Sequence, residues 1–150
     1  MLLQQAWQGE WYGVRVYGEL AAQRAKPDET ATLLELVVLE TYVLGELTVA
    51  LLGLGIEPDL GSIESEADHD LAAHAEDDWN TLIEWLKADA EVALGNYVQL
   101  PELAAGDETL SRLASLVLDH EGALITFANR TLAGESGALS DVRALVRVER

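Results

Sequence analysis

The sequence predicts an all-α protein, a four-helix bundle in which one long crossover joins two antiparallel helix pairs. Apolar residues recur at helical spacing over four long stretches. The three prolines, Pro27, Pro58 and Pro101, fall between these stretches, where a helix would stop. Alternating β-branched residues and Asn-Gly or Asp-Gly hairpin turns are absent from the sequence. With 150 residues, of which 49% are hydrophobic, the chain is long enough for one domain with its own core.

The first two helices are expected at about residues 2–25 and 27–54, joined by a tight turn. Asp28 and Glu29 fall in the first turn of the second helix, where the helix dipole favours acidic side chains. Gly53 lies at its end, where glycine commonly terminates a helix. Because the connection is short, the two helices should be antiparallel.

The other two helices are expected at about residues 71–100 and 107–132. Asp107 is a suitable N-cap for the last of them, and Gly134 would end it. Between the two helix pairs, the polar stretch 55–70 is long enough to cross over along the bundle.

The C-terminal part should be a small addition to the bundle. We expect residues 1–134 to form the bundle and residues 135–150 to be a tail or short helix packing on it. Ser140 or Asp141 would cap such a helix.

The charge balance excludes several kinds of partner. The formal net charge is −18, from 27 acidic and 9 basic residues, so the surface should repel nucleic acids and anionic membranes. Glu40 and Glu46 interrupt the most apolar stretch, 33–56, and the N-terminus lacks the pattern of a signal peptide, so we expect a cytoplasmic protein. The chain has no cysteine, which excludes disulfides and zinc–thiolate sites.

Polar side chains interrupt the apolar stripes of three predicted helices. Glu10 and Glu40 occupy core positions in the middle of the first and second helices, and His120 takes a core position on the last, beside Glu121 on an overlapping stripe. An unpaired carboxylate is costly to bury and tends to become protonated. We therefore expect these side chains to converge on a shared partner, and a divalent metal would satisfy several carboxylates at once. Carboxylate and imidazole ligands suit iron or manganese.

The contribution of the third helix stays open. Its cleanest stripe is wholly apolar, and Glu84, Asp89 and Glu91 lie on its flanks. The pattern alone does not choose among these three acids.

At these positions the chain resembles the ferritin-like superfamily, closest in style to its rubrerythrin-like members. The resemblance covers all four helices and rests on Gly9-Glu10 with Tyr17 and Leu20-Ala21, Glu40 with Leu54-Gly55, Ala90-Glu91 with Tyr97, and Asp119-His120-Glu121. It implies that Glu10, Glu40, Glu91 and His120 or Glu121 would be metal ligands.

The sequence departs from the complete ferritin-like pattern. In that family, a glutamate from each of two helices and a Glu-x-x-His from each of the other two bind two metals. Here Val43 and Leu124 stand where the two histidines would be. If two metals do bind, the resemblance implies a metal-dependent oxidoreductase acting on oxygen or peroxide.

Simpler interpretations of the same residues stay open. Glu10 and Glu40 could lie at the edge of the stripe and pair with an arginine such as Arg15. His120 could be a core histidine bonded to a buried carboxylate. The glycines of the first helix, Gly9, Gly13 and Gly18, either let two helices approach closely or leave space beside Glu10 for a ligand.

These interpretations correspond to other functions. The main alternative is a bundle without metal, a non-catalytic homodimer with a structural, binding or regulatory role. Exposed apolar residues such as Trp11 and Trp85 would supply its interface. A third alternative is a carrier for a small ligand.

Overall fold

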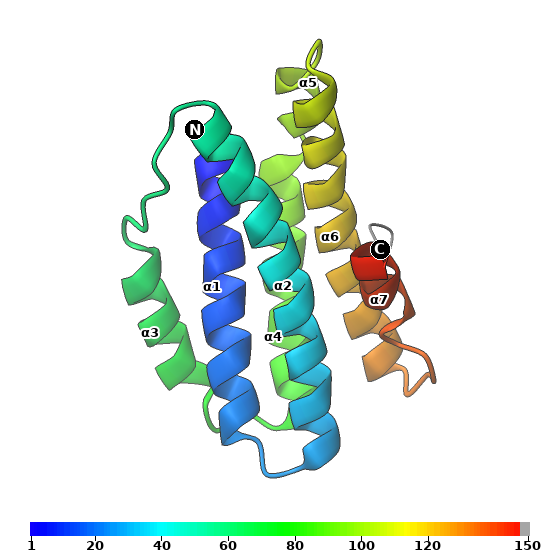
Figure 1. Cartoon of the computed structure of the whole chain (residues 1–150). Helices are drawn as coiled ribbons and strands as arrows, with labels where there is room; N and C mark the ends of the chain where they lie inside the picture. Colours follow the sequence, from blue (N-terminus) through cyan, green and yellow to red (C-terminus); the bar gives the residue numbers. More distant parts are fainter. Residues whose placement is uncertain (148–150) are drawn as a thin grey trace.

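The computed structural model describes residues 1–147, and over that range the chain is all-helical, as predicted (Figure 1). The helices are α1 (Leu2–Gln23), α2 (Pro27–Gly53), α3 (Ile63–His74), α4 (Trp79–Tyr97), α5 (Leu100–Leu103), α6 (Glu108–Leu132) and α7 (Ser140–Arg147). Helix α1 packs along α2, and α4 packs along α6. The two pairs meet where α2 contacts α6 and α1 contacts α4.

Local signals in the sequence set several helix ends where they were predicted. Helix α2 begins at Pro27. Asp107 caps α6 by accepting a hydrogen bond of 2.9 Å from the backbone N–H of Leu110. After α6, Gly134 adopts a positive φ of 70°, which other residues rarely adopt.

The region predicted as a crossover and third helix is divided differently. Residues 55–70 are not free of regular structure, because α3 begins within them at Ile63, and α4 begins only at Trp79. Asp78 starts α4 by accepting a hydrogen bond of 2.8 Å from the Thr81 N–H. Because α3 buries only Ala67 and Leu71, its apolar stripe is too narrow to stand out in the sequence.

Helix α3 lies beside α1 (Figure 1), and polar contacts join the two helices. The Tyr12 hydroxyl donates a hydrogen bond of 2.5 Å to Asp70 Oδ2. The Arg15 guanidinium lies 2.7 Å from Asp68 and 3.7 Å from Glu64. These contacts bring the acidic side of α3 to the side of α1 that carries Tyr12.

Helix α2 is apolar on both its inner and its outer face. Leu36, Leu39 and Val43 are fully buried on its inner face, whereas Val38 and Val49 are exposed on the outer one. By length and composition alone, α2 would be able to cross a membrane, a test that the central helix of a packed core also passes. The predicted C-terminal helix is present as α7, which packs on α6 and α2; residues 148–150 of the predicted tail lie outside the described part of the chain.

Candidate metal centre

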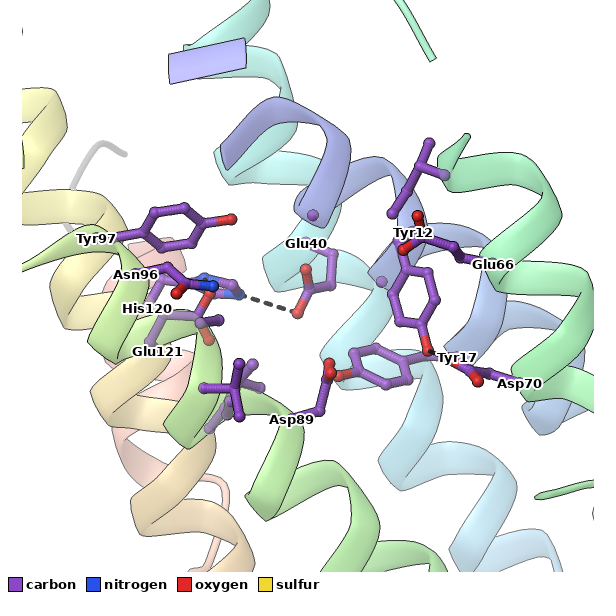
Figure 2. A pocket seen from close by; sticks show the side chains of 17 residues that line it. Tyr12, Tyr17, Glu40, Glu66, Asp70, Asp89, Asn96, Tyr97, His120 and Glu121 are labelled. Carbon is purple, nitrogen blue, oxygen red and sulfur yellow. Dashed lines mark hydrogen bonds and ion pairs between the residues drawn. The ribbon is translucent and has the colours of Figure 1, made fainter. Parts of the chain in front are cut away.

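Three buried polar side chains from three helices meet in the interior. Glu10 of α1, Glu40 of α2 and His120 of α6 are 1%, 2% and 2% exposed. One potential ligand atom from each lies within 4.8 Å of those of the other two. The His120 imidazole stands between the carboxylates, with Nε2 2.9 Å from Glu40 Oε1 and Nδ1 3.2 Å from Glu10 Oε1. Figure 2 shows the contact between His120 and Glu40.

Glu121 lies at the edge of this cluster. It is 5% exposed, and its Oε1 is 3.6 Å from His120 Nδ1. His120 and Glu121 are neighbours on α6, about 100° apart around the helix. Both are nevertheless buried, whereas Asp119 on the other side of His120 is exposed.

Glycine in α1 makes room for the Glu40 carboxylate. A Cβ atom at Gly13 would overlap Oε2 and Cδ of Glu40. A Cβ at Gly9 would lie 3.1 Å from the hydroxyl of Tyr97, which donates a hydrogen bond to the backbone carbonyl of Gln5. The close approach of helices predicted for the glycines of α1 therefore occurs at Gly13, where it admits a charged group.

The electrostatic balance of the cluster favours extra positive charge. Burial raises the pKa of Glu10 well above its usual value, and the Glu40 carboxylate adds to this while His120 opposes it. Burial likewise raises the pKa of Glu121. For His120, burial alone would lower the pKa, but the carboxylates of Glu10, Glu40 and Glu121 outweigh it and raise the pKa well above the usual value. Without a metal, Glu10, Glu121 and His120 therefore release their protons at a higher pH than the free side chains would.

Two buried polar atoms of the cluster have no hydrogen-bond partner among the described residues: Glu10 Oε2 and His120 Nδ1. Glu10 Oε1 and His120 Nδ1 are close enough for an ion pair but are not aligned for a hydrogen bond. Buried polar atoms are nearly always paired, and an unpaired one in a native structure calls for an explanation. A cation bound by both side chains would satisfy both atoms.

Comparison with protein-family models, with curated proteins and with solved structures finds no match to this chain. The ferritin-like resemblance therefore stays a prediction, and the candidate site is argued from its own geometry.

The structure brings together most of the predicted site residues but not all of them. Glu10, Glu40 and His120 converge as predicted, with Glu121 beside them. Glu91, implied by the resemblance, lies outside the cluster: its carboxylate is 53% exposed and 3.8 Å from the Lys87 ammonium. On α4 the neighbouring position, Ala90, faces the core instead.

Of the simpler interpretations, the structure contradicts the pairing with Arg15 and contains the contact between His120 and a buried carboxylate. Arg15 does not pair with Glu10 or Glu40, because it binds Glu19 and the acids of α3. The contact between His120 and Glu40 is the one expected of a core histidine bonded to a buried carboxylate. That interpretation does not explain the two unpaired atoms.

A cavity of about 190 Å³ opens beside the cluster, between α1, α3, α4 and α6 (Figure 2). Glu40, His120 and Glu121 line its inner part. Of the three acids left open on the third predicted helix, Asp89 lines this cavity. Asp70 of α3 lines it too, although no pattern in the sequence indicates that α3 reaches the site.

The pKa of Asp89 is raised although the residue is partly exposed to solvent. Loss of solvent on its inner side raises its pKa to about 6, and the carboxylates of Glu121, Asp70 and Glu40 add to the effect. The cavity thus has a surplus of negative charge from its mouth to the buried cluster.

Proposed function

We propose that this chain is a ferritin-like metal-binding protein in which Glu10, Glu40 and His120 hold a divalent ion, iron or manganese. One observation carries the proposal: three buried ligand atoms from three helices lie within 4.8 Å of one another. In this proposal α1, α2, α4 and α6 form the ferritin-like bundle, and α3 lies within the crossover between its two halves.

The chemistry of the three side chains supports a metal. Together they offer carboxylate oxygen and imidazole nitrogen, the ligand types that suit iron and manganese. With neutral imidazole, Glu10, Glu40 and Glu121 would carry three negative charges in the interior, and no lysine or arginine of the described residues lines the adjoining cavity. A divalent cation would offset much of this charge, whose burial is otherwise costly.

The ligand count favours one metal over two. The positions of the missing family histidines hold Val43, which is buried, and Leu124, which lines the cavity. Helix α4 contributes no group to the three-residue cluster. Three protein ligands leave open coordination positions, and the adjacent cavity could supply further ligands.

Metal uptake by the purified protein tests the proposal. After chelation and removal of the chelator, titration with Mn²⁺, or with Fe²⁺ under anaerobic conditions, should load one ion per chain, measured by elemental analysis and calorimetry. Glu40→Gln and His120→Ala should each weaken binding by at least tenfold. Glu91→Gln removes one exposed charge from the same protein and should bind as the wild type does. A chain that stays metal-free, or equal losses in all three variants, would overturn the proposal.

A second candidate function rests on the outer face of α2. Val38, Val49 and Leu52 are each more than half exposed there. On a surface with net charge −18, an uncharged helix face is where a second copy could dock without repulsion. The second proposal is a homodimeric structural, binding or regulatory module that joins through α2.

The tryptophans named for such an interface are engaged within the chain. The Trp85 ring stacks on His74 at a centroid distance of 4.1 Å, and the Arg15 guanidinium lies 5.9 Å from the Trp11 ring.

The test of the dimer therefore targets the outer face of α2. Light scattering after size exclusion should give twice the chain mass, and Val49→Glu should shift it to one chain, whereas Val98→Glu, at an exposed valine beyond α4, should not. A wild-type monomer would contradict the dimer and leave the metal proposal untouched.

A further inference from the structure

The cavity beside the metal centre has walls of unusual chemistry. Carboxylates from four helices line it: Glu40, Glu66, Asp70, Asp89 and Glu121. Among the described residues, no lysine or arginine lines it. Arg15, a neighbour on α1, is directed to Asp68, Glu64 and Glu19 instead. An anionic compound would be repelled along the whole cavity, whereas a cation would be attracted.

Three tyrosines also favour a cation in the cavity. The side chains of Tyr12, Tyr17 and Tyr97 line the cavity (Figure 2), and the faces of phenol rings attract cations. The Tyr12 hydroxyl donates a hydrogen bond to Asp70, and the Tyr97 hydroxyl donates one to the Gln5 carbonyl. Both hydroxyl oxygens therefore keep lone pairs that accept hydrogen bonds, so that the wall consists mainly of acceptors.

The inner end of the cavity holds an unpaired atom. His120 lines the cavity and is 2% exposed, and its Nδ1 has no hydrogen-bond partner among the described residues. Nε2 is engaged by Glu40 at 2.9 Å, so Nδ1 is the nitrogen of His120 that is left without a hydrogen-bond partner. The inner end of the cavity therefore has a buried polar atom that a bound compound can satisfy.

The volume sets the size of the compound. A cavity of about 190 Å³ is close in size to an engineered cavity of about 150 Å³ that binds benzene, so it admits a compact molecule. We propose that the compound which meets the metal centre is a small organic cation, a compact primary amine or diamine. Its ammonium group lies among Asp70, Asp89 and the tyrosine rings, and its other end points toward His120. The role of this compound as the substrate rests on the proposed metal-binding function, whereas its binding can be measured separately.

Three probes of equal length and different charge test the inference: 1,4-diaminobutane, 1,4-butanediol and succinate. Calorimetry at 0.15 M salt, on metal-free and on Mn²⁺-treated protein, should show binding of the diamine and no detectable binding of the other two. Asp89→Asn should weaken diamine binding by at least fivefold, and Glu91→Gln, which removes one exposed charge from the same helix, should change it by less than twofold.

The outcomes separate this inference from the metal proposal. Succinate or butanediol binding as tightly as the diamine, or equal losses in Asp89→Asn and Glu91→Gln, would overturn the amine assignment. So would uptake of a second Mn²⁺ that displaces the diamine. Diamine binding to a chain that takes up no metal would support the cation site and overturn only its link to a metal centre. Metal uptake without diamine binding would do the reverse.

Discussion

At the scale of single residues, Gly13 decides whether Glu40 can reach His120. A Cβ at this position would overlap the Glu40 carboxylate, which cannot move away without giving up its contact with His120. At Gly18, five residues further along the same helix, a Cβ would lie 4.0 Å from its nearest neighbour, Val37. Alanine substitutions at Gly13 and Gly18 can therefore be compared, because only the one at Gly13 would meet the Glu40 carboxylate.

Gly13→Ala should destabilise the fold by about 1–3 kcal/mol through overpacking and abolish metal binding. Gly18→Ala should instead gain up to about 1 kcal/mol, because alanine favours helix more than glycine does. Urea unfolding of both variants, together with Mn²⁺ titration, measures the contrast. If both variants gained stability and kept metal binding, the packing of Glu40 against α1 would be contradicted.

Residue patterns predicted the centre of the site better than its rim. Glu10, Glu40 and His120 could be predicted because each interrupts a long apolar stripe, and burial makes such an interruption meaningful. Glu91 was predicted mainly from the resemblance, and its helix turns Ala90 inward instead. Asp89 could not be singled out, because a side chain at the mouth of a cavity follows no stripe.

At the scale of elements, α3 is the least anchored helix over the site. It buries only Ala67 and Leu71, and it is held to α1 largely by Tyr12 and Arg15. The beginning of α3 at Ile63 could not be predicted from the sequence, because a helix held by polar contacts has no periodic apolar pattern. Elements with few buried apolar contacts open locally at low free-energy cost.

Arg15→Ala should therefore loosen α3 without unfolding the molecule. In amide hydrogen exchange, we expect the backbone of 63–74 to exchange at least severalfold faster in this variant, while α6 is unchanged. Arg112→Ala, at another exposed arginine that lies 3.4 Å from Glu46, is the control and should leave α3 as it is. Faster exchange throughout the molecule, or none in α3, would show that Arg15 does not fasten this helix.

At the scale of the whole molecule, the sequence predicted the helical class because apolar periodicity and the proline positions act over long stretches. It did not predict how the crossover is built, since that depends on contacts between α3 and α1. The summed charge has a further consequence for stability. Several acids hold protons more tightly in the folded chain than in the unfolded one.

For Asp89 the usual pKa of 3.8 rises to about 6, so the folded chain binds more protons between these values. Stability is therefore highest at the acid end of this window and falls as pH rises through about 6. His120, whose pKa is raised as well, extends the decline above its usual value of 6.5. We expect metal-free protein to unfold at higher urea concentration at pH 5 than at pH 8.

At pH 8, Asp89→Asn should raise the free energy of unfolding by about 1 kcal/mol after allowance for solvent screening, and at pH 5 it should raise it by less. A metal-free protein that is more stable at pH 8 would contradict the raised pKa values.

Bound metal should oppose this decline in stability with pH, because the ion and the protons compete for the same oxygen and nitrogen atoms. At pH 8 the cluster has released more of its protons, so a given concentration of Mn²⁺ should bind more tightly and stabilise the fold more than at pH 5. One ion at 100 times its dissociation constant adds about 2.7 kcal/mol to the free energy of unfolding. Calorimetric melting with and without Mn²⁺ at the two pH values should show a larger rise in Tm at pH 8. The rise should vanish in Glu40→Gln and persist in Glu91→Gln. An equal rise in both variants would place the ion on the acidic surface and not between the helices.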